Sequence, residues 1–172
     1  MKIFRISALI ATLTIASLAS TTPPAPSTVS VLPRLDSVQM RCLAKNIYYE
    51  APDESYEGKL AIATVTMNRL RSKSFPKTIC GVVYEHSKAG CQFSWTCGRR
   101  APFNRLAFKQ SEKIAIDVLT KNVRLVSIKN ALYFHNTSVL PKWEFAHPIK
   151  KIGNHIFYVV NTYGHKTNTG PA

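Results

Sequence analysis

The stretch Met40-Arg-Cys-Leu-Ala-Lys-Asn-Ile-Tyr-Tyr-Glu50-Ala-Pro52 predicts a helix that ends just after a glutamate. At about 100° per residue, the Glu50 carboxyl closes a stripe of side chains that is otherwise apolar. Pro52 cannot continue the helix and pushes Ala51 toward an extended conformation. Burial and the negative end of the helix dipole both disfavour a charge on Glu50 and so raise its pKa. A carboxyl that keeps its proton near neutral pH is what a general acid requires; the alternative is a carboxylate that reaches into water.

The composition fits one globular domain with a strongly basic charge. The chain has 172 residues, of which 45% are hydrophobic and 19% charged, enough for a single domain with a buried core. It carries 23 Lys and Arg against 9 Asp and Glu, a formal net charge of +14. Such a field favours a polyanionic partner. Nucleic acid, an anionic membrane and the acidic bacterial wall all qualify, so the charge alone does not choose among them.

The N-terminus indicates export. Lys2 and Arg5 form a short basic start, residues 6–18 are apolar and uncharged, and small residues lead up to Ala19. This pattern predicts a secretory signal peptide over residues 1–19, and hence a protein of the periplasm or cell wall. A retained membrane anchor is the alternative, although the apolar run is shorter than the about 20 residues that a span needs. Removal of the signal leaves 21 basic and 9 acidic residues, a net charge of +12, and no later segment apolar enough to cross a membrane.

The rest of the chain divides into a tether, one domain and a tail. Residues 20–36 are rich in Ser, Thr and Pro and predict a disordered tether, and residues 163–172 predict a flexible tail. The domain between them, residues 37–162, begins with helices and continues with mixed elements. That order is typical of an α+β fold with a small β element.

Caps and periodicity predict the elements of this domain. The predicted helices begin after Asp36 or Ser37, after Ser55 and after Asn104, and they end near Glu50, Ser72 and Lys121. Strand-like runs cover residues 91–97, 131–135 and 155–160. Residues 79–84 fit either a helix or a strand, and residues 141–148 are aromatic and rich in turn signals.

Export makes the four cysteines candidates for disulfide bonds. Cys42 lies on the first helix, and Cys80, Cys91 and Cys97 follow later and closer together. Four cysteines allow three pairings, and the sequence does not choose among them. A structural zinc site is the alternative, but these spacings lack the closely paired ligands usual in such sites. We expect no metal and no other cofactor.

Several polar and aromatic residues suit a sugar-binding cleft. Gln92, Ser94 and Trp95 offer an amide, a hydroxyl and a ring for sugar hydroxyls and sugar faces; the alternative is a surface hairpin with a structural Trp. Glu54, across the proline break from Glu50, can orient a water or a sugar hydroxyl, or it simply complements the dipole of the second helix. His135 follows a strand-like run and is either a functional residue or a hydrogen-bonded structural one.

A series of spaced blocks runs through the domain. The first block is Tyr49-Glu50-Ala51 with Glu54, Gly58, Ala61, Ala63, Val65 and Asn68-Arg69. The later blocks are Phe75-Pro76, Cys80-Gly81-Val82-Val83, Cys91-Gln92-Phe93-Ser94-Trp95, Trp143, and Lys151-Ile152-Gly153 with His155 and Phe157. Together they resemble the cell-wall hydrolase family that includes spore-cortex-lytic enzymes. The resemblance covers about residues 40–160, in the family's order.

The resemblance implies a lysozyme-like α+β domain that cleaves peptidoglycan between N-acetylmuramic acid and N-acetylglucosamine. It implies a lytic transglycosylase in which one glutamate, matching Glu50, acts as acid and then as base while the muramic acid 6-hydroxyl closes a 1,6-anhydro ring. The expected partner is the glycan strand and not nucleic acid, and the expected state is a monomer. The predicted substrate-contacting residues are Glu54, Gln92, Phe93, Ser94, Tyr133, His135 and Trp143.

One departure from the family pattern lies beside the predicted acid. Pro52-Asp53 stands where the family usually has Arg-Gly, so any ion pair of that arginine is lost and the loop is stiffer. Two alternatives to a lytic transglycosylase stay open, and the second follows from this departure. One is a muramidase that uses water, and the other is a catalytically degenerate basic module that binds the wall.

Overall fold

The computed structural model describes residues 36–88 and 90–160, which lie in one unit of the chain that begins at residue 33. The predicted signal, the predicted tether apart from Asp36, and the predicted tail fall outside these two ranges. Inside them, no helix combines the length and the hydropathy that a membrane crossing requires.

Helix α1 (Ser37–Glu50) begins and ends where the sequence predicts. The Asp36 carboxylate accepts hydrogen bonds from the backbone N–H groups of Val38 and Gln39, at 2.9 and 3.2 Å, so Asp36 is the cap. At the other end Ala51 leaves the helical conformation, with φ −133° and ψ 50°, and Pro52 follows. The helix therefore stops at Glu50.

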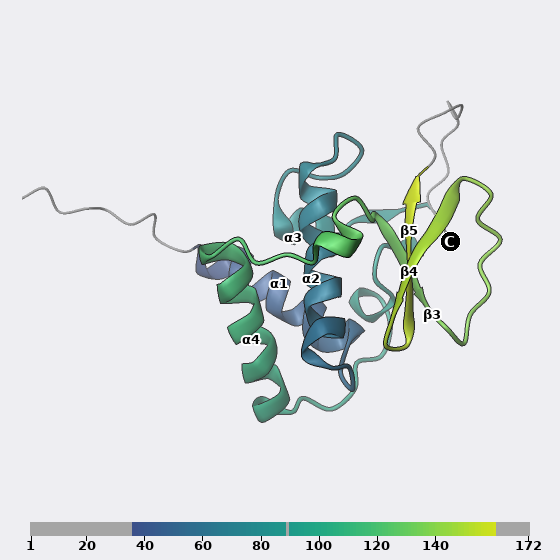
Figure 1. Ribbon diagram of the computed structural model, residues 1–172. Coiled ribbons are helices and arrows are strands. Elements are labelled where there is room, and N and C mark those ends of the chain that lie inside the picture. The colour runs from purple at the N-terminus through teal and green to yellow at the C-terminus, as the bar shows by residue number, and fades with distance from the viewer. Residues whose placement is uncertain (1–35, 89, 161–172) are drawn as a thin grey trace, which may run out of the picture. The chain divides into compact units, whose positions relative to one another are not determined.

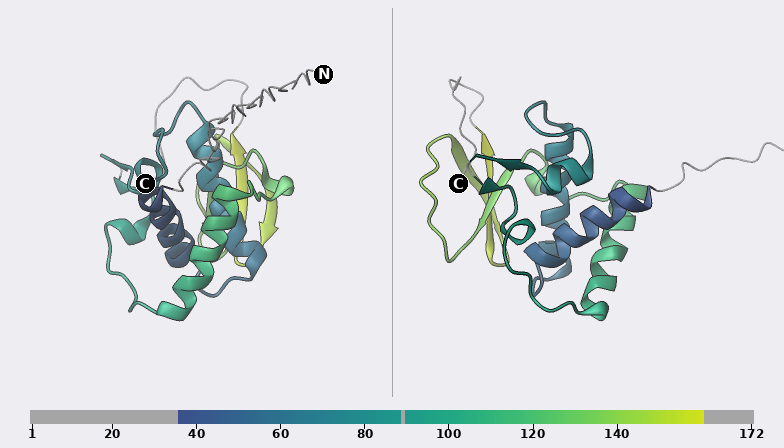
Figure 2. Two further views of the ribbon diagram at one scale, coloured as in Figure 1. Left: turned by 90° about the vertical axis from the view of Figure 1, so that its left-hand side faces the viewer. Right: turned by 180° about the vertical axis from the view of Figure 1, so that it is seen from behind.

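Helix α2 (Tyr56–Arg71) runs through the centre of the domain. Ser55 caps it by accepting a hydrogen bond from the N–H of Gly58 at 3.2 Å. Every residue from 58 to 69 is buried, so neighbours enclose the helix on all sides. Leu60, Ala63 and Met67 pack with the other helices, whereas Ala61, Ile62 and Val65 pack toward the sheet. Figures 1 and 2 show α2 between these two layers.

Two further helices complete the helical layer. Helix α4 (Arg105–Thr120) begins at its predicted cap, because the Asn104 side chain accepts from the N–H groups of Leu106 and Ala107. It packs against α1 through Phe108, Ile114 and Val118 among others. Residues 79–84, which fit either a helix or a strand, form the short helix α3 (Ile79–Val83).

The β structure is small and antiparallel. Strands β3 (Tyr133–Asn136), β4 (Ala146–Ile152) and β5 (His155–Val160) form one sheet in the order β3-β5-β4. A tight turn at Gly153 and Asn154 joins β4 to β5, and Ile152 pairs with His155 across it. A second ladder joins β1 (His86–Ser87) to β2 (Gly90–Cys91). The α+β prediction is confirmed.

Two local predictions were wrong. The sequence predicted a turn-rich segment over residues 141–148, whereas β4 begins within it at Ala146 because β5 supplies an edge to pair with. The sequence also predicted a strand over residues 91–97. There β2 ends at Cys91, and Ser94–Thr96 forms a 3-10 turn, η1, that sends Trp95 into the core.

The four cysteines form two disulfides. Cys42 of α1 is bonded to Cys80 of α3, with 38 residues of sequence separation. Cys91 is bonded to Cys97, and this second bridge closes the short segment that contains η1. The first disulfide therefore ties two helices together, and the second fixes the ends of one loop.

Candidate active site

Glu50 is a half-buried carboxyl at the C-terminal end of α1. Burial raises the pKa of this carboxyl to about 7, against the opposing effect of the positive charge of Arg69. The negative end of the helix dipole acts in the same direction as burial. Glu50 can therefore donate a proton near neutral pH and take one back, as the sequence predicts.

Arg69 is a buried cation on α2 whose charge acts on Glu50. Its Nε donates a hydrogen bond to the carbonyl of Leu132 at 2.7 Å. The side-chain oxygen of Gln92, turned toward the guanidinium, accepts from the two terminal nitrogens at 3.1 and 3.2 Å. The rings of Phe75, Phe93 and Tyr133 surround the guanidinium, with centroids 5.0–5.7 Å away. Burial lowers the pKa of Arg69 to about 10, which leaves it charged at neutral pH.

Glu85 places a second carboxyl within the electrostatic field of the Arg69 guanidinium. Burial raises the pKa of Glu85, and the Arg69 charge partly offsets that effect. Its Oε2 is buried and has no hydrogen-bond partner among the residues that the structure describes. Its backbone carbonyl accepts from the N–H of Gln92 at 2.9 Å, so the two residues are neighbours across the β1–β2 ladder. Glu85 therefore has one carboxylate oxygen that is enclosed and unpaired among the described residues.

Sequence reasoning missed both Arg69 and Glu85 as site residues. Arg69 appears in the sequence only as the end of a resemblance block, and Glu85 as one of several scattered acids. A usable signal was present for Arg69, because residues 60–67, which lie just before Asn68 and Arg69 on the same helix, carry no charge and are mostly small or apolar. No local pattern distinguishes Glu85, since its surroundings come from α2 and the segment after β2.

The segment closed by the Cys91–Cys97 disulfide contributes residues with different roles. Gln92 and Phe93 contact Arg69, as described above, and Ser94 is exposed. Trp95 is buried: its Nε1 donates to Asn46 at 3.1 Å, and its ring stacks on Tyr49 at 4.6 Å. Of the two alternatives for Trp95, the geometry favours the structural one.

An aromatic cluster lies beside Tyr133. The ring of Trp143 lies 5.9 Å from that of Tyr133 and 5.7 Å from that of His135. His135 is buried, and its Nε2 lies 2.7 Å from the hydroxyl of Tyr158. Trp143 is half-buried and keeps part of its ring exposed. Of this cluster, Trp143 and Tyr133 offer surface to a ligand, whereas His135 is held within the sheet.

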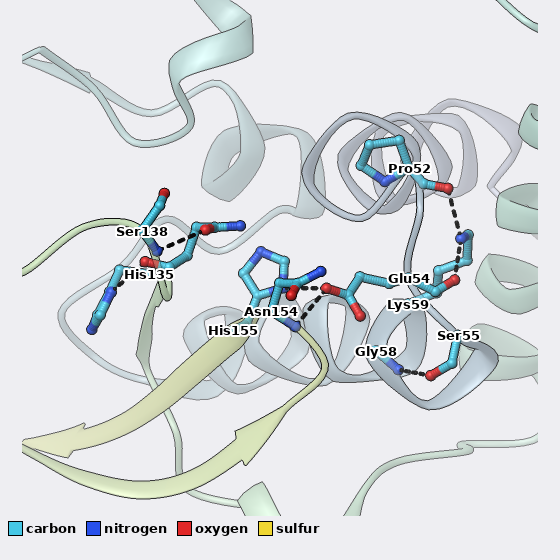
Figure 3. A network of polar contacts seen from close by, with 10 residues as sticks. Pro52, Glu54, Ser55, Gly58, Lys59, His135, Ser138, Asn154 and His155 are labelled. Atoms are coloured by element: carbon cyan, nitrogen blue, oxygen red, sulfur yellow. Dashed lines mark hydrogen bonds and ion pairs between the residues drawn. The ribbon is translucent and has the colours of Figure 1, made fainter.

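Glu54 is engaged with the sheet and not with Arg69. Its Oε1 accepts from the backbone N–H of Asn154 at 2.8 Å and lies 3.3 Å from Nδ1 of His155, too oblique for a good hydrogen bond. Only 7% of the Glu54 side chain is exposed. Figure 3 shows its carboxylate pointing at the β4–β5 turn. Burial lowers the pKa of His155, with Glu54 opposing, so the histidine is neutral at pH 7.

One group of side chains has the geometry of a metal site. The ligand atoms of His86, Cys91 and Cys97 lie within 4.8 Å of one another. The Cys91–Cys97 disulfide uses both sulfur atoms, however, and thiolates are what bind soft metals. In this state the group offers only the imidazole of His86.

Comparison with known proteins agrees with this architecture. The sequence pattern of the cell wall hydrolase family matches residues 53–158. The chain is 32% identical to the spore cortex-lytic enzymes of Bacillus subtilis (strain 168), over 119 residues, and of Bacillus cereus, over 120 residues. Each match covers 69% of this chain but only 36% and 43% of the relative, so the chain spans about two fifths of their length.

Solved structures with this fold have similar sequences. The catalytic domain of the germination-specific lytic transglycosylase SleB from Bacillus anthracis superposes with a TM-score of 0.58 at 30% identity, over 74% of this chain and 99% of that one. The catalytic domain of the Bacillus cereus SleB protein gives a TM-score of 0.51 at 32% identity, over 70% and 88%. The chain belongs to the cell wall hydrolase family.

Proposed function

We propose that the protein cleaves peptidoglycan as a lytic transglycosylase, between N-acetylmuramic acid and N-acetylglucosamine, with Glu50 as its single acid and base. The observation that carries the proposal is the Glu50 carboxyl at the end of α1, whose pKa burial raises to about 7. Glycoside cleavage usually needs one protonated carboxyl at the leaving oxygen. Membership of the cell wall hydrolase family and the likeness to SleB catalytic domains support the reaction class.

The reaction needs one proton to move out and back. Glu50 donates its proton to the glycosidic oxygen as the bond between that oxygen and C1 of muramic acid breaks, which releases the N-acetylglucosamine 4-hydroxyl. The positive charge of Arg69 stabilises the carboxylate that remains, since it lowers the pKa of Glu50. Glu50 then removes the proton of the muramic acid 6-hydroxyl while that oxygen bonds to C1. The product is a 1,6-anhydro ring, and Glu50 is protonated again.

The exposure of each side chain indicates which of the predicted residues can contact the substrate. Ser94 presents an exposed hydroxyl, and the half-buried rings of Tyr133 and Trp143 offer faces on which a sugar can stack. Gln92 and Phe93 take part through Arg69, which they hold in place. We infer that the protein acts alone on glycan strands outside the cytoplasm, where the net charge of +12 that remains after removal of the predicted signal favours the anionic wall.

Digestion of purified sacculi tests the proposal. The wild type is expected to release soluble muropeptides whose masses are those of 1,6-anhydro products. A hydrolase instead adds water and leaves reducing ends, so mass analysis separates the two reactions. Binding to sacculi without release of any product would refute the proposal and favour the degenerate wall-binding module.

One observation favours a water-using muramidase as the second candidate. The Glu85 carboxyl shares the field of Arg69 and has a buried oxygen without a partner among the described residues. A second carboxylate can activate a water molecule against C1. If the sacculus products carry reducing ends and Glu85→Gln suppresses them, the muramidase assignment replaces the lytic transglycosylase.

Removing the charge of Arg69 is expected to move the pH profile upward. Glu50 must be protonated to act, so kcat/KM should fall as pH rises through about 7, the pKa of its carboxyl. The Arg69 charge lowers that pKa, so Arg69→Met should raise it and shift the fall in activity to higher pH. Release of muropeptides, measured from about pH 5 to 9 for both proteins, checks this. A profile that moves to lower pH would contradict the assigned role of Arg69.

A further inference from the structure

The connection between α1 and α2 is fastened to the sheet at two points. Ala51, the residue after Glu50, is fully buried in a cluster with Ile152 of β4 and Phe157 of β5. Three residues later, the Glu54 carboxylate accepts the N–H of Asn154 in the β4–β5 turn. The N–H of Glu54 also donates to the carbonyl of Ala51 at 3.4 Å, which closes the connection on itself. The end of α1 that holds Glu50 is therefore held from outside the helix.

Lys59 holds the same connection from the side of α2. Its ammonium group donates to the carbonyl of Pro52 at 3.0 Å and to that of Glu54 at 2.6 Å. Burial lowers the pKa of Lys59, and the charges of Asp53 and Glu54 oppose that effect. Figure 3 shows Glu54 between Lys59 and His155, with its backbone turned to one and its carboxylate to the other. The backbone and the side chain of Glu54 are thus both fixed.

The β4–β5 turn is shaped to receive this carboxylate. Gly153 has φ +55°, and a Cβ added there would lie 1.8 Å from Oε2 of Glu54. No other residue type fits without displacing the carboxylate. Gly90, the other glycine with positive φ among the described residues, has nothing within 4 Å of the same position. The close approach at Gly153 therefore belongs to the Glu54 contact and not to turns in general.

We propose that Glu54 is a positioning residue for the reaction: by fastening the α1–α2 connection to the β4–β5 turn, it sets the place of the Glu50 carboxyl. The proposal rests on the proposed function, and it replaces the role of substrate contact that the sequence suggested for Glu54. With its carboxylate 7% exposed and occupied by Asn154, Glu54 has little surface for a sugar. Its effect on the chemistry passes through the backbone of residues 51–53.

Charge-neutral variants of two neighbouring acids test this role. Glu54→Gln keeps the shape of the side chain but removes the negative charge that strengthens its hydrogen bond from the N–H of Asn154, whereas Asp53→Asn makes the same change of net charge on an exposed side chain. On sacculi, Glu54→Gln is expected to lower kcat about tenfold with KM nearly unchanged, the scale of a small misplacement of a reacting group. Asp53→Asn is expected to stay within about twofold of the wild type.

The alkaline limb of the pH profile gives a second readout. Loosening the end of α1 exposes Glu50, and because burial is what raises its pKa to about 7, the limb should move to lower pH in Glu54→Gln. A purely structural role would lower Tm and leave both kcat and this limb unchanged. Loss of affinity with unchanged kcat would instead restore the role of substrate contact.

A double-mutant cycle identifies the contact itself. Gly153→Ala should displace the Glu54 carboxylate and lower kcat about tenfold. Gly90→Ala is the control, because it measures the stability lost when alanine is placed at a positive φ without such a collision. If the methyl group added by Gly153→Ala acts by colliding with Glu54, then Glu54→Ala/Gly153→Ala should be no slower than Glu54→Ala. Additive losses would overturn the proposal. If the wild type releases 1,6-anhydro muropeptides from sacculi and Glu50→Gln does not, the proposed function stands whatever these variants do, so the two failures are separate.

Discussion

Glu50→Gln is expected to lower the rate of glycan cleavage by at least about 100-fold, and up to about 10,000-fold, the scale of general acid–base catalysis. The amide has nearly the same volume as the carboxyl but cannot give up or accept the proton that both steps of the proposed reaction require. The two other carboxyls near the site do not replace it in the lytic transglycosylase mechanism. Glu54 is bound to the β4–β5 turn, and Glu85 follows α3 and lies in the field of Arg69.

The measurement is release of muropeptides from sacculi by the wild type and the variant at about pH 6, where a carboxyl with a pKa of about 7 is mostly protonated. Glu57→Gln is the matched control, because it makes the same chemical change on an exposed side chain in the first turn of α2. A Glu50→Gln protein that is folded and cuts at more than about a tenth of the wild-type rate would exclude Glu50 as the acid.

The same substitution is expected to stabilise the folded protein at alkaline pH by on the order of 3 kcal/mol. The pKa of the Glu50 carboxyl is raised from 4.5 to about 7 on folding, and each unit corresponds to about 1.4 kcal/mol. Between pH 4.5 and 7 the folded state binds more protons than the unfolded state, so the wild type loses stability as pH rises through this window. Below pH 4.5 both states are protonated and the penalty is absent.

Denaturant unfolding of the wild type and Glu50→Gln at about pH 4 and about pH 8 checks this. The difference in the free energy of unfolding between the two proteins should be larger at the higher pH, with Glu50→Gln the more stable. Any effect of the amide on packing cancels when the two pH values are compared. Glu57→Gln, which changes an exposed side chain, should give no such difference. Equal differences at both pH values would mean that Glu50 is solvated and its pKa ordinary.

These two expected results have one cause. A carboxyl that is hard to ionise in the folded protein is a good proton donor at neutral pH, and for the same reason it destabilises the fold once it is ionised. Arg69 limits that cost by placing a positive charge near Glu50. The guanidinium is itself buried, and Gln92 and Leu132 accept its hydrogen bonds. The Glu50 carboxyl therefore lies in the electrostatic field of a cation that burial also disfavours, since burial lowers the pKa of Arg69 to about 10.

The helical part of the fold could be predicted because its signals are local. Asp36, Ser55 and Asn104 cap the helices they precede, and each cap acts on N–H groups only two or three residues away. Pro52 ends α1 by the geometry of its own ring. The position of Glu50 at a helix end, and the rise in its pKa, were therefore predictable from the short stretch of sequence around it.

Strand β4 and the segment 91–97 were less predictable, because the groups that they contact are distant in sequence. Strand β4 forms from a segment with turn-like composition because β5 pairs with it. The segment 91–97 has strand-like composition, yet it turns inward because Trp95 stacks on Tyr49 and bonds to Asn46, both on α1. Neither strand propensity nor turn propensity carries that information.

The sequence by itself determined where Glu50, the proposed proton donor, lies along the chain, the helix that carries it, and the family to which the blocks correspond. Only the tertiary structure decided which cysteines are bonded, that Arg69 and Glu85 share a field with Glu50, and that Glu54 turns away to the β4–β5 turn. The reason is physical. Caps and helix ends follow from neighbours in sequence, whereas the energy of a buried charge depends on groups that only folding brings within a few ångströms.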